Sequence, residues 1–215
     1  MLELKNTLVV IPSALDLSEF KSEETKEELR MKLGIPKNIL TFGIIGRFDV
    51  QKCQLLLLQA MQKCKNKGFN VVFLGEPTLN EGDGYFGQMK EIIEEENLKS
   101  RVFIKPYRKD TLTFFKSIDW MVMASKAETF GMVTIESIAS GTPVLGSNAG
   151  GTPELLSNET AGLLFESQDS SDLTNKIDLI CERNIQFEQS HLMKMAEAYD
   201  HNLICTKVEE VLNLE

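Results

Sequence analysis

The sequence predicts an α/β protein built on a Rossmann-like, doubly wound parallel sheet. Short apolar segments that suit buried strands alternate with amphipathic segments that suit helices. Glycines and charged residues gather directly after the apolar segments. The chain has 215 residues, of which 42% are hydrophobic and 26% charged, an ordinary composition for a globular protein.

The predicted strands are short apolar runs bounded by turn residues. They cover 8–11, 39–46, 71–75, 101–106, 119–125, 142–147 and 162–166. Pro12 stops the first strand, because proline cannot donate a hydrogen bond to a sheet. A helical segment separates most strands from the next one, which favours parallel pairing.

The predicted helices have apolar residues at helical spacing or end at a glycine. They cover 19–33, 52–66, 88–97, 110–117, 131–140, a short helix after the glycine turn at 149–151, 169–183 and 187–213. Gly34 closes the first of these helices, and Gly141 closes the one over 131–140. The segment 76–87 is rich in glycine and acidic residues and is predicted to be a loop.

We expect one domain over residues 1–215. Its core spans about 38–183, residues 1–37 supply a linker strand and a surface helix, and residues 184–215 supply C-terminal helices. No internal repeat or low-complexity linker interrupts it.

Charge and composition exclude several classes of function. The net charge is −9 and the pI about 4.9, so the protein would repel nucleic acids and anionic lipids. The four cysteines form no CxxC pair and there are two histidines, which argues against a zinc site and favours reduced thiols in the cytoplasm. No apolar run approaches the length of a membrane span, and no signal segment is visible.

Ligands of open parallel sheets bind at the carboxyl ends of the strands. The glycines and polar residues that follow the strands are Gly46–Arg47, Gly75, Pro106–Tyr107, Ser125–Glu128 and Ser147–Gly151. The candidate site therefore lies at this end of the sheet.

The segment GRFDVQK places Arg47 after a core strand and Lys52 at the start of the next helix. A guanidinium and an ammonium on either side of a turn can bind a diphosphate. Taken alone, two solvated surface cations are the more common outcome of such a pattern.

The segment ETFGMVTIE places Glu128 just before a predicted helix and Glu136 inside it. At helical rise the two lie roughly 12 Å apart, about the length of a sugar–diphosphate–ribose ligand. Carboxylates accept from neighbouring hydroxyls, and the helix N-terminus between them suits a phosphate. Glu128 also fits a plain helix N-terminal acid, whereas Glu136 lies among apolar residues and needs donors from ribose hydroxyls, a lysine or a backbone amide.

The segment SNAGGTPE, residues 147–154, fits a backbone turn close to a ligand and an efficient strand-to-helix turn equally well. The sequence lacks the motifs of two other nucleotide-binding sites, since neither the GxGxxG fingerprint of dinucleotide-binding folds nor a Walker A loop is present. No Ser–His–Asp set is visible either, because His191 and His201 both lie in the C-terminal helical region.

In their order and spacing these motifs resemble the donor-binding, C-terminal half of a glycosyltransferase of the GT-B fold, in the group 1 (family 4) retaining class. The resemblance runs from VIPSALD to about residue 166. Beyond the motifs above it includes Val10–Ile11–Pro12, Asp16, the LGIP at 33–36, Phe73–Leu74–Gly75, Ala139, Gly141, Pro143–Val144, Glu154 and Gly162–Leu163–Leu164.

The resemblance implies a role for each site residue. Arg47 and Lys52 would bind the donor diphosphate and offset charge as the leaving group departs, and Glu128 would contact hydroxyls of the transferred sugar. Glu136 would hold the ribose, and Tyr107 would contact the base. The remaining donor contacts would be Gly46, Phe130, Gly131, Met132 and Val133. No metal or other cofactor is implied, because the cations and the helix dipole replace it.

This sequence departs from the family pattern at several positions. Cys53 replaces the usual glycine after the lysine, Ser13–Ala14 replaces Asn–Gly, and Ala124 replaces proline. The class also has an N-terminal acceptor-binding domain, which the resemblance places outside this chain. The C-terminal helices from about residue 187 would pack against that missing half, and the chain alone would bind donor weakly and transfer nothing.

The cysteines and the missing signal segment favour a cytoplasmic protein, with a peripheral position on the inner membrane open to a full-length enzyme that uses a lipid acceptor. Polysaccharide biosynthesis is one setting for such an enzyme, and the sugar, base and acceptor stay open. Two alternatives remain: a nucleotide-sugar epimerase of the same architecture, and a non-catalytic binding or assembly module.

Overall fold

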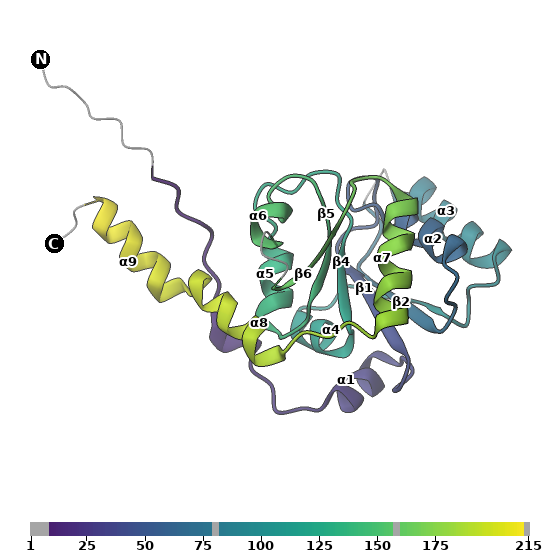
Figure 1. Ribbon diagram of the computed structural model, residues 1–215, viewed down its shortest axis with the longest axis horizontal. Coiled ribbons are helices and arrows are strands. Elements are labelled where there is room, and N and C mark those ends of the chain that lie inside the picture. Colours follow the sequence, from purple (N-terminus) through teal and green to yellow (C-terminus); the bar gives the residue numbers. More distant parts are fainter. Residues whose placement is uncertain (1–8, 79–81, 157–159, 213–215) are drawn as a thin grey trace, which may run out of the picture.

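The computed structural model describes residues 9–78, 82–156 and 160–212, which form a parallel sheet between two layers of helices (Figure 1). The six strands pair in the order β3-β2-β1-β4-β5-β6. Their bounds are β1 (Leu40–Ile45), β2 (Phe69–Leu74), β3 (Val102–Lys105), β4 (Trp120–Met123), β5 (Val144–Ser147) and β6 (Gly162–Phe165). The chain order reverses between β1 and β4, so the crevice of a doubly wound sheet is expected above these two strands.

Helices connect the strands and cover both faces of the sheet. Their bounds are η1 (Leu17–Phe20), α1 (Lys26–Leu33), α2 (Gln54–Lys63), α3 (Gly82–Glu95), α4 (Thr111–Ser117), α5 (Met132–Ala139), α6 (Thr152–Leu156), α7 (Ser170–Arg183), α8 (Gln189–Ala196), η2 (Glu197–Tyr199) and α9 (His201–Leu212). None of the described helices is long and apolar enough to cross a bilayer.

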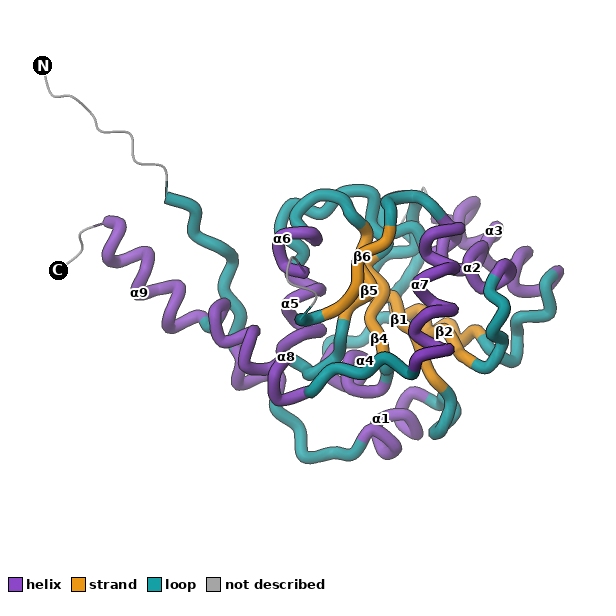
Figure 2. The backbone as a smooth tube through the Cα atoms, in the orientation of Figure 1, coloured by secondary structure: helices purple, strands orange, loops and turns teal. Residues whose placement is uncertain are grey.

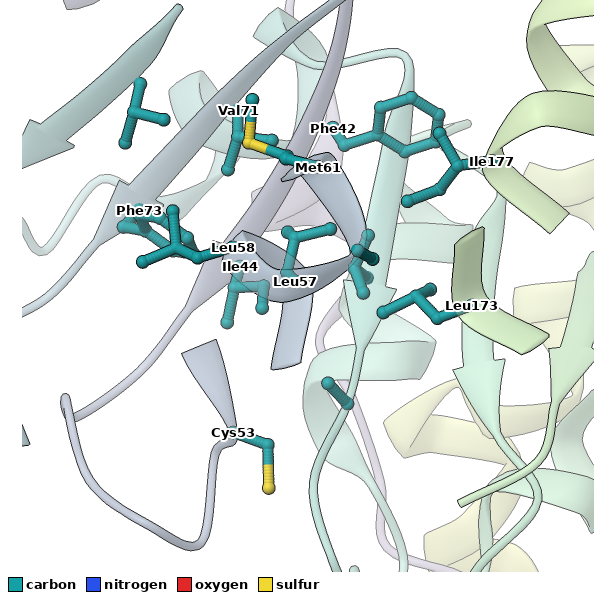
Figure 3. Packing of buried hydrophobic residues seen from close by; sticks show 14 of the residues in the cluster. Phe42, Ile44, Cys53, Leu57, Leu58, Met61, Val71, Phe73, Leu173 and Ile177 are labelled. Carbon is teal, nitrogen blue, oxygen red and sulfur yellow. The ribbon is translucent and has the colours of Figure 1, made fainter. Parts of the chain in front are cut away.

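One face of the sheet packs against α2, α3 and α7. Figure 3 shows Leu57, Leu58 and Met61 of α2 beside Val71 and Phe73 of β2. This contact is buried, since none of these side chains is measurably exposed. Burial of apolar surface on this scale is the main stabilising contribution to the fold.

The other face packs against α1, α4, α5 and α8. Val72 and Leu74 point to this face, because successive residues of a strand alternate between the two sides. Both faces of β2 are apolar, which explains why the strand is a continuous hydrophobic run rather than an alternating one.

Six of the seven predicted strands are confirmed, and the first is wrong. Residues 9–11 form no strand, and residue 8 lies outside the described residues. Val10 stays largely exposed, and no strand in the described part of the chain pairs with this segment. The predicted helix 19–33 is broken into η1 and α1, with Thr25 capping the second piece through a capping box to Glu28.

Two other predicted boundaries change. The predicted loop 76–87 ends early, because α3 already begins at Gly82; residues 79–81 lie outside the described residues. The predicted helix 187–213 is divided into α8, η2 and α9, with residue 213 outside the described part. Leu192 and Ala196 of α8 are fully buried in the core, so this face of α8 packs within the domain.

The segment before η1 and the helix α9 extend away from the sheet on the same side (Figure 2). Leu15 and Asp200 form a parallel bridge at the base of this extension. The Leu15 amide donates to the Tyr199 carbonyl, and the His201 amide donates to the Leu15 carbonyl. Within α9 only Ile204 is buried.

Candidate functional site

A charged contact joins the two central strands at the carboxyl end of the sheet. Lys52, in the loop between β1 and α2, donates from Nζ to Oε1 of Glu128 at 2.5 Å. Glu128 lies in the loop between β4 and α5, and the Lys126 amide donates to the Gln51 carbonyl at 3.0 Å, so the two loops adjoin. The contact therefore lies at the point where the strand order reverses.

The two oxygens of the Glu128 carboxylate have different surroundings. Oε1 accepts from Lys52 and also from Ser125 Oγ, at 2.7 Å. Oε2 has no hydrogen-bond partner among the described residues, although a carboxylate oxygen can accept two bonds. The side chain is about one-fifth exposed, and Oε2 keeps unused capacity to accept hydrogen bonds.

The loop that carries Lys52 is organised by Asp49. The buried Asp49 carboxylate accepts from the Gln51 and Lys52 amides, each at 3.0 Å. Its other oxygen accepts from Thr78 Oγ1 at 3.2 Å, which joins this loop to the one after β2. Asp49 also lies 3.6 Å from Nε of Arg47.

The backbone of Arg47 is held by a hydrogen bond, whereas its guanidinium is largely exposed. Its carbonyl accepts from Nε2 of the buried Gln54 at 2.8 Å, whereas its side chain is 68% exposed. With a single long contact to Asp49, the guanidinium has most of its five donors available.

A cavity of about 530 Å³ lies beside Arg47, over the ends of β1, β2 and β3. It is lined by Ile45, Gly46, Arg47, Gly75, Glu76, Pro77, Thr78 and Tyr107. Gly46 and Gly75 have φ of 137° and 152°, and a Cβ on Gly75 would lie 1.9 Å from the Gly46 carbonyl oxygen. Only glycine at 75 lets these two strand ends approach so closely. Tyr107 is 61% exposed.

The helix α5 begins beside Glu128 at Gly131, whose φ of 77° is left-handed. No side chain caps this helix end, so its first amides and the positive end of its dipole are available to an anion. Phe130 packs edge-on against Tyr199, with ring centroids 5.9 Å apart. The rest of the predicted contact segment, Met132 and Val133, is half-buried at the first turn.

Glu136 is half-buried on α5, and its carboxylate has no hydrogen-bond partner among the described residues. Burial raises the pKa of Glu136 above its ordinary value. No lysine or backbone amide of the described chain satisfies it, which was the ordinary alternative to a ligand. Glu136 is also not placed in contact with Lys52 or Arg47, so the four predicted charges are only partly brought together.

The paired glycines at 150 and 151 pack against the backbone of Glu128. The Gly151 amide donates to the Glu128 carbonyl at 2.7 Å, and a Cβ on Gly150 would lie 2.2 Å from the same oxygen. The turn therefore comes close to the backbone at Glu128 and Thr129. This is a structural role in holding the loop that carries Glu128.

Cys53, at the family's usual glycine position, has a left-handed φ of 55°. The conformation explains why glycine suits this position. The Cys53 side chain makes no cap for α2; the Tyr85 hydroxyl of α3 instead accepts from the Leu55 amide at 3.0 Å.

Sequence reasoning missed Asp49 and Gln54. An aspartate in a turn just before a helix is a common capping signal, and it could have indicated Asp49. Gln54 gives no comparable signal, because its contact with the Arg47 carbonyl depends on the fold of the loop. Within the described part of the chain, no three histidine, cysteine or acidic side chains gather closely enough to hold a metal ion.

Comparison with known proteins identifies the family of this chain. The family model for glycosyl transferases group 1 matches residues 25–199. A D-inositol 3-phosphate glycosyltransferase of Corynebacterium kroppenstedtii is 29% identical over 182 residues, which are 81% of this chain and 40% of that protein. The same-named protein of Mycolicibacterium smegmatis is 25% identical, over 83% of this chain and 41% of its own. The chain thus spans about two-fifths of the curated relatives it matches.

Solved structures give the same result. The Anabaena protein HepE in complex with UDP superposes with a TM-score of 0.87 and 25% identity, covering 95% of this chain and 57% of that one. Its complex with UDP-glucose gives a TM-score of 0.85 at the same identity and coverage. The C-terminal domain of LpcC from Francisella tularensis, 22% identical, shares the fold with a TM-score of 0.69 over 90% of this chain and 98% of its own.

Proposed function

Because this chain belongs to the group 1 glycosyltransferases, we propose that it is the donor-binding half of a retaining enzyme that transfers a sugar from a nucleotide diphosphate. The observation that carries the proposal is the Lys52–Glu128 contact between the two central strands. It places a cation suited to a diphosphate beside a carboxylate suited to sugar hydroxyls.

The two cations act on the leaving group. Arg47 and Lys52 bind the diphosphate, and their positive charge offsets the negative charge that develops as the bond to the sugar breaks. Lys52 leaves Glu128 for the diphosphate, since a phosphate oxygen is also a strong acceptor for an ammonium. The dipole of α5 adds to the same field, so the proposed reaction needs no metal ion.

The two acids hold the sugars on either side of the diphosphate. Oε2 of Glu128 has no partner among the described residues and accepts from a hydroxyl of the transferred sugar. The Glu136 carboxylate likewise has no hydrogen-bond donor among the described residues, and it accepts from the ribose hydroxyls. The amides of Gly131, Met132 and Val133 contact the sugar and phosphates from the helix end, next to Phe130.

The base lies against Tyr107, at the edge of the cavity that Gly46 also lines. Because HepE binds UDP and UDP-glucose, uridine is the first base to test. A ribose-binding glutamate by itself does not distinguish UDP from GDP or ADP.

We propose that an acceptor-binding domain completes the active site, because the curated relatives are more than twice as long as the matched region. Val10, Leu203 and Leu212, on the extension formed by residues 9–15 and α9, are exposed apolar residues that such a domain can cover. The acceptor, the cytoplasmic location and a role in polysaccharide synthesis belong to this proposal. The isolated chain binds donor weakly and transfers no sugar.

Titration calorimetry with UDP, GDP and ADP tests the proposal. We expect one of them to bind and R47A to weaken it at least tenfold, because a charge-assisted hydrogen bond contributes about 1.5–3 kcal/mol. R183A is the matched control, since Arg183 is exposed at the end of α7 and should leave affinity unchanged. A wild-type chain that binds none of the three contradicts donor binding and favours a non-catalytic module.

The epimerase alternative gains no support. His191 and His201 lie on α8 and α9, and neither lines the cavity beside Arg47. We therefore propose sugar transfer, rather than epimerisation, as the reaction.

A further inference from the structure

We propose that Ser125 is a positioning residue that keeps the Glu128 carboxylate aimed at the donor sugar after Lys52 has moved to the diphosphate. The inference rests on the proposed function and adds a residue to it. It follows from the way two donors share a single oxygen of Glu128.

Ser125 is rigidly placed. It is 2% exposed and lies two residues after the end of β4, and its carbonyl accepts from the buried Ser147 Oγ at 2.9 Å. Its own hydroxyl donates to Glu128 Oε1 at 2.7 Å. The Met123 sulfur lies 3.5 Å from the same hydroxyl, but a thioether is a much weaker acceptor than a carboxylate.

The two groups that donate hydrogen bonds to Oε1, Lys52 and Ser125, respond differently when a nucleotide sugar binds. Lys52 is charged and carries its ammonium on a flexible four-carbon stem, so a bound diphosphate competes for it. Ser125 is neutral and buried, so a phosphate does not attract its hydroxyl as strongly as it attracts the Lys52 ammonium. Once Lys52 has moved, Ser125 is the remaining described side chain that holds Oε1.

This hydrogen bond determines where Oε2 points. The terminal torsion of a glutamate has a broad energy profile, so an unrestrained carboxylate samples many orientations. With Oε1 fixed by Ser125, Oε2 keeps one direction, toward the site of the sugar. Such fixed polar groups are what orient a substrate for reaction.

The test compares nucleotide with nucleotide-sugar affinity. Titration calorimetry on the full chain would measure Kd for UDP and UDP-glucose, and likewise for GDP with GDP-mannose and ADP with ADP-glucose, using the pair that binds. We expect S125A to leave the affinity for the nucleoside diphosphate within twofold. It should weaken the sugar-linked form about tenfold, so the ratio of the two Kd values changes.

A matched control and a double mutant separate positioning from folding. S117A removes another buried serine hydroxyl, in α4, at the opposite end of the sheet, and should change neither Kd. In an E128A background, S125A should change the Kd ratio by less than twofold, because Ser125 acts through Glu128. Thermal unfolding should give melting temperatures for S125A and S117A that differ little.

The outcomes distinguish the two proposals. If the wild type binds none of the nucleotides, the proposed function fails and this inference fails with it. If the wild type binds but S125A keeps the wild-type Kd ratio, this inference alone is overturned. Equal losses for the diphosphate and its sugar-linked form, or an effect that persists in E128A, likewise overturn it.

Discussion

The two ends of the sheet both carry charged side chains, yet they use them in opposite ways. At the amino end, Arg30 is 3% exposed and donates to the carbonyls of Ser117, Lys37 and Ile39 and to the Asp119 carboxylate. At the carboxyl end, Arg47 is mostly exposed and Glu136 has no partner among the described residues.

Asp119 shows how complete the amino-end network is. Its carboxylate accepts from Arg30, from Lys26 at 2.8 Å and from the Thr41 amide at 2.8 Å. A cavity of about 540 Å³ adjoins this network, as large as the one beside Arg47. Cavity size therefore does not distinguish the ends, whereas unused hydrogen-bonding capacity does. Charges with full sets of partners hold the amino end together, whereas the unused hydrogen-bonding capacity marks the carboxyl end as the candidate ligand site.

The largest expected effect comes from D119A, which tests the amino end. It leaves Arg30 buried without its counter-charge, so we expect a loss of about 3 kcal/mol in the free energy of unfolding. Urea denaturation measures this loss. D169A, which removes only the N-terminal cap of α7, should cost about 1 kcal/mol, and a smaller loss for D119A than for D169A would contradict the comparison.

The next effect comes from K52A, which tests the carboxyl end. We expect the affinity for UDP to fall about tenfold while the free energy of unfolding changes by less than about 0.5 kcal/mol, since Glu128 keeps its bond to Ser125. Calorimetry and urea denaturation measure the two quantities. K63A, at the C-terminal end of α2, the helix that follows Lys52, is the control and should affect neither. A large stability loss without weaker binding would make Lys52 a structural residue.

A smaller effect is expected from E136Q, which removes a charge that the fold does not satisfy. Burial raises the pKa of Glu136 above 4.5, so the folded state holds this proton more tightly than the unfolded state does. Its contribution to stability is therefore greatest below pH 4.5 and decreases as the pH rises through the raised pKa.

For E136Q we expect that decrease to disappear and stability at pH 7 to rise by about 0.5 kcal/mol, without a gain in nucleotide affinity. Unfolding curves collected across the acid range measure it. E95Q, on the exposed side of α3, should leave the pH profile as it is. An unchanged profile in E136Q would show that Glu136 is well solvated.

The smallest effect is expected from C53G. Glycine relieves the left-handed backbone but loses the packing of a buried side chain and makes the unfolded chain more flexible. These contributions oppose one another, so we expect a net change within about 0.5 kcal/mol by urea denaturation, and UDP affinity within twofold. A clear loss of binding would mean that Cys53 itself shapes the phosphate turn.

Local patterns predicted most of the fold. Apolar runs such as 39–46 and 71–75 correspond to β1 and β2 because burial on both faces of a sheet requires continuous hydrophobic sequence. The pattern at 8–11 looked the same but formed no strand in the described residues 9–11. A strand also needs a partner, and no pattern within the segment reports whether a partner is present.

The sequence predicted which elements carry the candidate site residues, but it did not predict how those residues are arranged. The sequence by itself determined that Arg47, Lys52 and Glu128 lie in loops after strands, at the carboxyl end of the sheet, and that Glu136 lies inside the helix that follows Glu128. Only the tertiary structure decided that Lys52 and Glu128, 76 positions apart, meet, because that contact depends on β1 and β4 becoming neighbours. It also decided that Arg30 is satisfied and Glu136 is not, since burial and partners come from packing between distant segments.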